Sequence, residues 1–259
     1  MNWTLADRAV VDAICSLHTH SNKPLLIGLA GAQGSGKSTM ARRLKPKLEA
    51  QDLRTAVLAL DDFYLPREDR LALAQEIHPL LETRGVPGTH NVILLDDVID
   101  QLLSGEHPVE VPQFDKASDE RTDPALIEGP VDIVLLEGWC IGASAVGSGA
   151  LELPINDLER TEDADAIWRN WVNRRLETDY ATLFRRIDLR IFLCAPDFSV
   201  VAGWRTEQES DLTVPSMNPA QLARFVAHFE RITRAMLDSD WADLVIELDA
   251  KRVPVALRQ

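Results

Sequence analysis

The sequence predicts an α/β fold in which a doubly wound, mainly parallel five-stranded sheet carries helices on both faces. Five short runs of the chain are almost continuously apolar, whereas a strand with one face in water would alternate polar and apolar residues. Longer segments with helical periodicity separate these runs, and this alternation is typical of a parallel sheet covered on both sides. The five runs are residues 25–30, 55–60, 131–136, 189–194 and 244–248.

Four segments place apolar residues at helical spacing and are expected to be helices packed on the sheet. The last of them has Asn218 as its expected N-cap and Pro219 as its first helical residue. The aromatic residues of the third segment are expected in the core, because core packing explains them better than a stacking platform. The apolar positions are Met40, Leu44 and Leu48; Leu95, Val98, Ile99 and Leu102 in 91–103; Ile167, Trp168, Trp171, Val172, Leu176, Tyr180 and Leu183 in 163–186; and Leu222, Phe225, Val226, Phe229, Ile232 and Met236.

Length and composition predict a single domain over residues 1–259, since a chain of this size can bury one large core. The chain has 41 acidic against 27 basic residues and a formal net charge of −14. This balance argues against nucleic acid or an anionic membrane as partner, because both need a basic surface. It does not exclude a phosphate pocket, because charges are screened over roughly 8 Å and a few local cations suffice.

The chain shows neither a leader pattern nor an apolar run near the roughly 20 residues of a membrane helix, so we expect a cytoplasmic protein. Cys15, Cys140 and Cys194 are few and widely spaced. They are expected as reduced thiols in the core, not as a disulfide framework or a zinc site.

A phosphate-binding motif follows the first predicted strand. Residues 31–39 read Gly-Ala-Gln-Gly-Ser-Gly-Lys-Ser-Thr. They match the P-loop pattern, which consists of a glycine, any four residues, Gly-Lys and then Ser or Thr. Glycines let backbone N–H groups turn toward phosphates, and the next helix adds the positive end of its dipole. We therefore expect a P-loop NTPase fold with Lys37 at the β- and γ-phosphates of ATP and Ser38 on Mg²⁺. The nucleotide contacts expected are Gly31, Gln33, Gly34, Ser35, Gly36, Lys37, Ser38 and Thr39, of which Thr39 fits a packing role equally well.

Carboxylates follow the second and third predicted strands. Asp61 and Asp62 leave the second strand in opposite directions, so one should face the site, and Asp61 is the predicted base for the acceptor hydroxyl. Asp61 would also help to hold Mg²⁺ through water, although a solvated acid pair is the alternative. Glu137 directly follows the third run, where P-loop proteins carry an acid related to Mg²⁺. The predicted metal set is therefore Ser38, Asp61 and Glu137.

Three other segments could supply cations or hydrogen-bond donors. Arg84 could bind a substrate carboxylate or phosphate through two bonds, and His90 could hydrogen-bond an acceptor hydroxyl. Lys116 could contact an anion. Residues 197–212 fit a short lid whose Arg205 would offset charge on the transferring phosphoryl group. Taken alone, these segments are also explained as loops, a helix cap and a surface helix.

Taken together, these segments resemble the D-glycerate 3-kinase family, within the wider group of uridine, pantothenate and phosphoribulose kinases. The likeness runs from Leu25 to about Asp249. Its specific parts are the P-loop, Asp-Asp-Phe-Tyr-Leu at 61–65, Arg-Gly-Val-Pro-Gly-Thr-His at 84–90, Pro-Gln-Phe-Asp-Lys at 112–116 and Leu-Glu-Gly-Trp at 136–139. The resemblance implies an ATP- and Mg²⁺-dependent kinase in which the acid opening Asp-x-Phe is the base, which favours Asp61 over Asp62. The expected acceptor-side residues are Asp61, Tyr64, Arg84, His90 and Lys116.

Two departures from the family pattern lie on the expected acceptor side. Asn91 stands where the family often has Asp, and the acidic stretch 118–123 replaces a glycine-rich one. They leave a uridine- or pantothenate-type acceptor as the alternative to D-glycerate.

The sequence thus predicts an enzyme that transfers the γ-phosphoryl group of ATP to a hydroxyl of a small metabolite, with D-glycerate as the first candidate. Lys37, Asp61, Glu137 and Arg205 are the predicted catalytic residues. A nucleotide switch protein is disfavoured because the guanine-reading motif Asn-Lys-x-Asp does not occur. A non-catalytic nucleotide-binding protein is disfavoured because the residues expected for catalysis, Lys37, Ser38, Asp61 and Glu137, are all present. The oligomeric state does not follow from the sequence.

Overall fold

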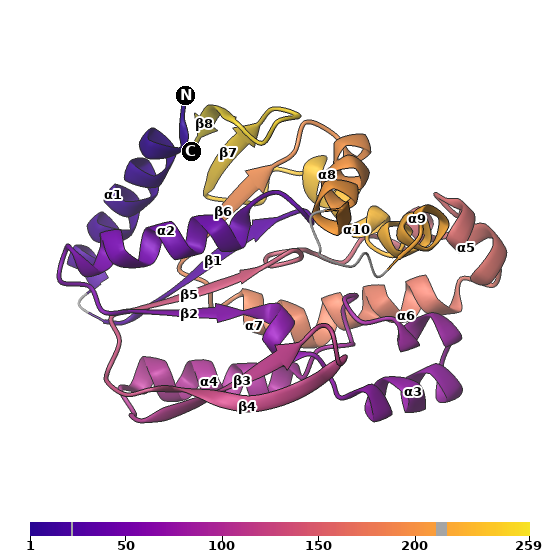
Figure 1. Ribbon diagram of the computed structural model, residues 1–259, viewed down its shortest axis with the longest axis horizontal. Coiled ribbons are helices and arrows are strands. Elements are labelled where there is room, and N and C mark those ends of the chain that lie inside the picture. The colour runs from indigo at the N-terminus through magenta and orange to yellow at the C-terminus, as the bar shows by residue number, and fades with distance from the viewer. Residues whose placement is uncertain (22, 211–216) are drawn as a thin grey trace.

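The computed structural model describes residues 1–21, 23–210 and 217–259, and its centre is a six-stranded sheet with the strand order β2-β5-β1-β6-β7-β8 (Figure 1). The five predicted strands are confirmed as its parallel part, with boundaries within two residues of those expected. The sixth strand, β8, runs antiparallel to β7 and was not predicted. The strands are β1 (Leu25–Gly31), β2 (Thr55–Ala59), β5 (Ile133–Gly138), β6 (Leu189–Cys194), β7 (Leu244–Leu248) and β8 (Pro254–Arg258).

Helices cover both faces of the sheet (Figure 1). In β1, Leu25, Ile27 and Leu29 join the apolar core on one face, and Leu26 and Ala30 join the core on the other, as the two-residue period of a strand requires. The first core includes side chains of α1 (Trp3–Ser21), α2 (Lys37–Glu49), α8 (Phe198–Ser210) and α9 (Pro219–Ala227). The second includes those of α4 (Val92–Ser104), α6 (Ile167–Arg175), α7 (Ala181–Phe184) and α10 (Glu230–Leu237).

The predicted helices are confirmed with two differences. The segment 163–186 forms α6, a π-helical turn (Leu176–Tyr180) and α7, and Ile167 at its start is half exposed. The last predicted helix begins at Pro219 with Asn218 as N-cap, as expected, but α9 ends at Ala227, a turn follows at His228 and Phe229, and α10 begins at Glu230. The predicted apolar stripe is divided between the two cores, with Leu222 and Val226 in the first core and Phe225, Phe229, Ile232 and Met236 at the second.

A two-stranded antiparallel hairpin stands apart from the sheet and was not predicted. It comprises β3 (Val109–Asp115) and β4 (Glu120–Ile127), so the Pro-Gln-Phe-Asp motif lies in a strand and Lys116 lies in the turn. Most side chains of β4 are exposed, which explains why no apolar run marked it. The hairpin reaches the main fold at the 3₁₀ turn Leu60–Phe63, where the Phe114 N–H group donates to Asp62.

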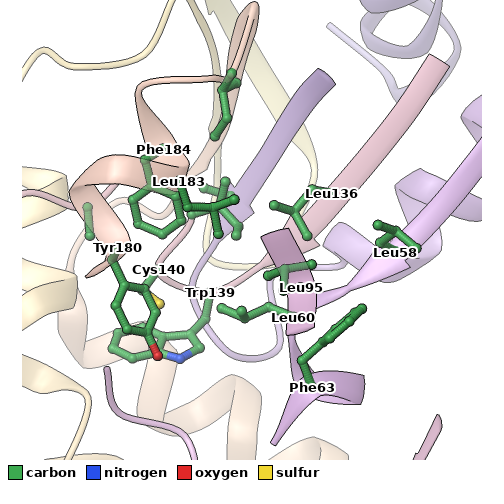
Figure 2. Packing of buried hydrophobic residues seen from close by; sticks show 14 of the residues in the cluster. Leu58, Leu60, Phe63, Leu95, Leu136, Trp139, Cys140, Tyr180, Leu183 and Phe184 are labelled. Carbon is green, nitrogen blue, oxygen red and sulfur yellow. The ribbon is translucent and has the colours of Figure 1, made fainter. Parts of the chain in front are cut away.

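The core beneath the carboxyl end of β2 and β5 joins strand, turn and helix residues (Figure 2). Leu58, Leu136 and Trp139 come from these strands or the segment after them, and Tyr180 comes from the π-helical turn. Cys140 is fully buried here, as predicted for a core thiol, whereas Cys15 and Cys194 are only partly buried. The remaining helices are α3 (Arg67–Glu76) and α5 (Asp157–Glu162), with 3₁₀ turns at Pro79–Glu82 and Ser148–Leu151.

Within the described part of the chain, no helix is long and apolar enough to cross a membrane.

Candidate active site

The P-loop connects the end of β1 to the start of α2. Gly36 caps α2 with a φ of 93°, and Gly34 has a φ of 79°, both in the left-handed region that favours glycine. A Cβ on Gly34 would lie 2.7 Å from the Cβ of Trp204 in α8, so the loop and this helix pack without room for a larger residue. Ser35 is fully buried, and the amide atoms of Gln33 make no hydrogen bond within the described residues.

Lys37 and Ser38 both converge on Glu137. The Ser38 hydroxyl donates to Oε1 of Glu137 at 2.6 Å, and the Lys37 Nζ atom lies 3.9 Å from Oε2. The convergence follows from the topology, because Glu137 pairs with Leu29 across the β1–β5 ladder and thus stands beside the loop that leaves β1. Thr39 is exposed and accepts a hydrogen bond from Arg42, so it is not a core residue.

The donor set beside the P-loop fits Mg²⁺. A serine hydroxyl and a carboxylate are hard oxygen donors, and Mg²⁺ in kinases is held by one or two carboxylates together with substrate phosphates and water. Ser38 and Glu137 supply these groups 2.6 Å apart. The described residues contain no group of three or more His, Cys, Asp or Glu side chains that could hold a metal ion by itself. Phosphate oxygens would therefore complete the coordination.

Asp61 lies between a phenol and an ammonium group. Its Oδ1 accepts from the Tyr64 hydroxyl at 2.8 Å, and its Oδ2 accepts from the Lys116 Nζ at 2.5 Å. Burial alone would raise the pKa of Asp61, but the positive charges of Lys116 and Lys37 outweigh it and hold this pKa well below its ordinary value. Asp61 is therefore ionised at neutral pH, and both of its oxygens have partners.

Asp61 and Asp62 point to different partners, although the reason differs from the one expected. Both lie in the 3₁₀ turn after β2, which ends at Ala59, and not at the end of the strand. The turn directs Asp62 to the Phe114 N–H group of the hairpin at 3.3 Å, and burial raises the pKa of Asp62.

His90 joins the same cluster through Tyr64. The backbones of Tyr64 and His90 form an antiparallel bridge, and their rings stack with centroids 4.7 Å apart. His90 is 4% exposed, and burial lowers its pKa to about 4. Its Nδ1 atom lies 2.7 Å from the hydroxyl of Tyr180. The imidazole is thus neutral at physiological pH and fixed from two sides.

Arg84 is held by the hairpin turn. Its guanidinium forms an ion pair with Asp119 and donates to the Lys116 carbonyl at 3.2 Å, and it lies 5.7 Å over the ring of Phe114. The buried Arg70 of α3 binds the same Asp119 carboxylate at 2.7 Å. Asp119 belongs to the acidic stretch 118–123 that departs from the family pattern. This stretch therefore provides the carboxylate that holds Arg84 in place beside Lys116.

The predicted lid residues form α8 as far as Ser210, and the last two, Asp211 and Leu212, lie outside the described residues. The Arg205 guanidinium lies 5.5 Å over the ring of Phe225 in α9. The structure thus joins Lys37, Ser38 and Glu137 in one cluster and Asp61, Tyr64, His90, Arg84 and Lys116 in a neighbouring one. The Arg205 guanidinium instead contacts Phe225 of α9.

Sequence reasoning missed Arg252, which follows β7 and reaches the P-loop. Its Nε atom donates to the Gly34 carbonyl at 2.7 Å, its guanidinium stacks 5.3 Å over Trp204, and it forms an ion pair with Glu207 at 2.6 Å. The only signal in the sequence is its place after an apolar strand, at the sheet edge where ligands bind. Asp119 and Tyr180 were also missed as site residues.

A groove of about 890 Å³ lies between α3, the start of α4 and the π-helical turn, and His90 and Tyr180 contribute to its lining. Lys37, Asp61 and Glu137 do not line it. Its side chains include the carboxylates of Asp69, Glu76, Asp96, Asp97 and Asp179, so it does not suit phosphate groups.

Comparison with known proteins identifies relatives among kinases. No protein-family model matches the chain. A kinase of Schizosaccharomyces pombe, mug58, is 30% identical over 227 residues, which are 80% of this chain and 79% of that protein. The chloroplastic D-glycerate 3-kinase of Arabidopsis thaliana is 26% identical over 257 residues, which are 90% of this chain and 54% of that protein.

Among solved structures, the D-glycerate 3-kinase from Cryptococcus neoformans var. grubii superimposes with a TM-score of 0.83. The match covers 98% of both chains at 24% sequence identity. At this identity the likeness establishes the fold, and the P-loop NTPase prediction is confirmed.

Proposed function

Because this chain belongs to the D-glycerate 3-kinase-like family of P-loop kinases, we propose that it transfers the γ-phosphoryl group of ATP to a hydroxyl group of D-glycerate. The enzyme is an ATP-dependent phosphotransferase of small molecules, and the acceptor is the part that we propose. One observation carries the proposal. Asp61, a carboxylate able to orient a hydroxyl, lies within the field of the P-loop Lys37 and is paired with Lys116, which adjoins Arg84.

Phosphoryl transfer at this site depends on position and charge. Lys37 binds the β- and γ-phosphate oxygens, and Asp61 accepts a hydrogen bond from the acceptor hydroxyl and takes its proton during transfer. Its lowered pKa makes Asp61 a weak base, so its main contribution is to orient the hydroxyl for in-line attack. Arg205 of α8 is assigned as the second cation that offsets developing charge, with residues 197–212 as the lid.

Ser38 and Glu137 are the residues that would hold Mg²⁺. When bound, the ion would supply positive charge that offsets the negative charge of the phosphate groups. Asp61 belongs to the proposed metal set through a bridging water.

An acceptor that carries a carboxylate is favoured by the charges beside Asp61. Lys116 and Arg84 adjoin each other through the Lys116 carbonyl. An acceptor with a carboxylate could form charged hydrogen bonds with these two cations, whereas a neutral nucleoside could not. Asp119 neutralises part of this charge and orients the Arg84 fork. A uridine- or pantothenate-type acceptor is the second candidate, and it would need a broader pocket lined by aromatic rings.

The proposal also includes the organisation of the protein. Residues 1–259 would act as one kinase domain, and the location would be cytoplasmic.

The test is ADP release by the purified protein with ATP and Mg²⁺ against D-glycerate, L-glycerate, pantothenate, uridine and ribulose 5-phosphate. Turnover stimulated by D-glycerate alone is expected and would support both class and acceptor. Stimulation by another member would keep the kinase and replace the acceptor. If no member stimulates ADP release above the level without acceptor, D-glycerate is excluded.

A further inference from the structure

His90 has one paired and one unpaired ring nitrogen in a buried position. The Nδ1 atom lies 2.7 Å from the Tyr180 hydroxyl, whereas the Nε2 atom is covered and has no hydrogen-bond partner among the described residues. Which nitrogen carries the proton decides whether the unpaired atom is a donor or an acceptor.

The surroundings of Tyr180 decide this question. The Gly88 N–H group donates to the Tyr180 oxygen at 3.0 Å, so that oxygen already acts as an acceptor. Tyr180 is fully buried, and burial raises its pKa well above the ordinary value, so its hydroxyl keeps its proton and needs an acceptor. The acceptor within reach is Nδ1 of His90.

The opposite arrangement leaves two groups unsatisfied instead of one. If His90 carried its proton on Nδ1, this N–H and the Gly88 N–H would both donate to Tyr180, and the Tyr180 O–H and the unprotonated Nε2 atom would both lack a partner among the described residues. A buried, unpaired donor costs roughly 1–3 kcal/mol. The arrangement in which Tyr180 donates to Nδ1 pairs the Gly88 N–H, the Tyr180 O–H and the Nδ1 atom, and it leaves the Nε2 N–H group as the one group without a partner among the described residues.

We propose that Tyr180 is a positioning residue that holds His90 in its neutral form with the proton on Nε2, and that this N–H donates to an oxygen of the acceptor substrate. The second half of this statement rests on the proposed kinase function, and the first half does not. His90 would thus act as a fixed donor on the acceptor side, and Asp61 as the acceptor of the hydrogen bond from the reacting hydroxyl.

The local structure is suited to this role. Tyr180 ends the π-helical turn, and such turns often occur at functional sites. Its ring packs edge-on against Phe184 with centroids 5.8 Å apart and lies in the core with Trp139 and Cys140 (Figure 2). On the other side, Tyr64 stacks on His90 and donates to Asp61, so the histidine and the predicted base are connected through one ring.

The tautomer can be measured without substrate. Two-bond and three-bond ¹H–¹⁵N correlation spectra at pH 7 distinguish a protonated from an unprotonated imidazole nitrogen, and His90→Gln identifies the His90 signals among those of the 6 histidines. The wild-type protein is expected to show His90 with the proton on Nε2. Tyr180→Phe, which removes only the hydroxyl, is expected to shift His90 toward the Nδ1-protonated form. A wild-type protein with the proton on Nδ1, or a Tyr180→Phe protein with an unchanged spectrum, would overturn the proposal.

Kinetics test the second half of the statement. With the acceptor found by the ADP-release panel, Tyr180→Phe is expected to lower kcat/KM for that acceptor about threefold to tenfold, the value of one hydrogen bond, with KM for ATP unchanged. Phe184→Leu is the matched control, because it loosens the same packing but keeps the hydroxyl. It should leave both the tautomer and kcat/KM close to wild type, and equal losses in both variants would mean that Tyr180 acts only through packing.

The spectra and the kinetics test the two halves of the proposal separately. If the ADP-release panel finds no acceptor, the proposed acceptor D-glycerate is excluded, while the spectra still test the tautomer.

Discussion

Asp61 illustrates how neighbours change the chemistry of one residue. A free aspartate already accepts protons weakly at neutral pH, and the cations Lys116 and Lys37 lower the pKa of Asp61 further. Such a carboxylate stays ionised and directs a hydroxyl by accepting its hydrogen bond. The role of Asp61 is therefore primarily geometric, and its loss should affect turnover much more than nucleotide binding.

Asp61→Asn is expected to lower kcat by about 10²–10⁴-fold, because the neutral amide loses the ion pair with Lys116 that fixes the orientation of residue 61 and cannot take the proton. The dissociation constant for ATP should change by less than about threefold, because the P-loop is intact. ADP release and calorimetric titration with ATP measure the two quantities.

Asp62→Asn is the matched control. The amide oxygen of the substituted residue 62 would still accept the hydrogen bond from the Phe114 N–H group. Its kcat should stay within about tenfold of wild type, the size of one weakened hydrogen bond. Strong loss of ATP binding by Asp61→Asn with little change in turnover would contradict the assignment.

Arg84 is a second residue whose geometry matters more than its charge. Its planar guanidinium is oriented by Asp119 and by the Lys116 carbonyl. A lysine ammonium could not bind both groups with the same geometry. Arg84→Lys is expected to raise KM for the acceptor about fivefold to thirtyfold, the loss of one charged hydrogen bond, and to leave KM for ATP unchanged.

Steady-state kinetics with each substrate varied in turn measure this effect. Arg67→Lys is the control, because Arg67 is an exposed residue of α3 paired with Glu82 at 3.9 Å. An equal rise in KM for ATP in Arg84→Lys would show that Arg84 serves the nucleotide and not the acceptor.

At the scale of elements, the turn after β7 supports the P-loop. Arg252 links this turn to the Gly34 carbonyl and to Glu207 of α8. It has a φ of 63°, in the left-handed region that is uncommon for a side chain of this size. The phosphate loop, the helix predicted as lid and the carboxyl end of β7 are therefore joined by one guanidinium group.

Arg252→Ala is expected to raise KM for ATP about fivefold to twentyfold, because the Gly34 carbonyl loses a charged hydrogen bond and the loop loses its order. The value of kcat at saturating ATP should fall by less than about threefold, since the groups at the γ-phosphate remain.

Arg258→Ala provides the comparison from the same end of the chain, since Arg258 pairs with Glu247 across β7 and β8 and not with the P-loop. Its KM for ATP should match the wild type. Equal KM values in Arg252→Ala and the wild type would exclude the supporting role.

At the scale of the whole molecule, the buried histidines connect folding to pH. His90 and His228 are 4% and 2% exposed, and burial lowers the pKa of each to about 4. An unfolded histidine titrates near 6.5, so the unfolded chain binds more protons between about pH 4 and 6.5. Stability is therefore complete above this range and is lost as the pH falls through it.

The free energy of unfolding is expected to fall by about 2 kcal/mol for each of these histidines between pH 7 and pH 5. His228→Gln should reduce this fall in the free energy of unfolding by about 2 kcal/mol, because a glutamine does not titrate. Urea unfolding of both proteins at the two pH values measures the difference.

His20→Gln is the control, because His20 is exposed on α1. It should leave the pH dependence of the wild type unchanged. The interpretation is wrong if His228→Gln shows the same loss of stability between pH 7 and pH 5 as the wild-type protein.

The sequence by itself determined the parallel strands, the main helices and the P-loop. These features are encoded in short windows, because a strand buried on both faces must be apolar throughout and a helix repeats every 3.6 residues. The P-loop also needs its glycines and lysine within nine consecutive residues. The sequence also indicated Asp61 and Glu137 as site residues, because residues at the carboxyl ends of parallel strands meet at one edge of the sheet.

Only the tertiary structure decided how distant residues complete the site. The exposed β4 and the edge strand β8 carry no clear apolar pattern, so they were missed, and with them the turns that hold Asp119 and Arg252. The pairs Arg252–Gly34 and Tyr180–His90 join residues 218 and 90 positions apart. No local pattern records such contacts, because they arise only when separate elements pack on one sheet and a buried polar atom must find its partner there.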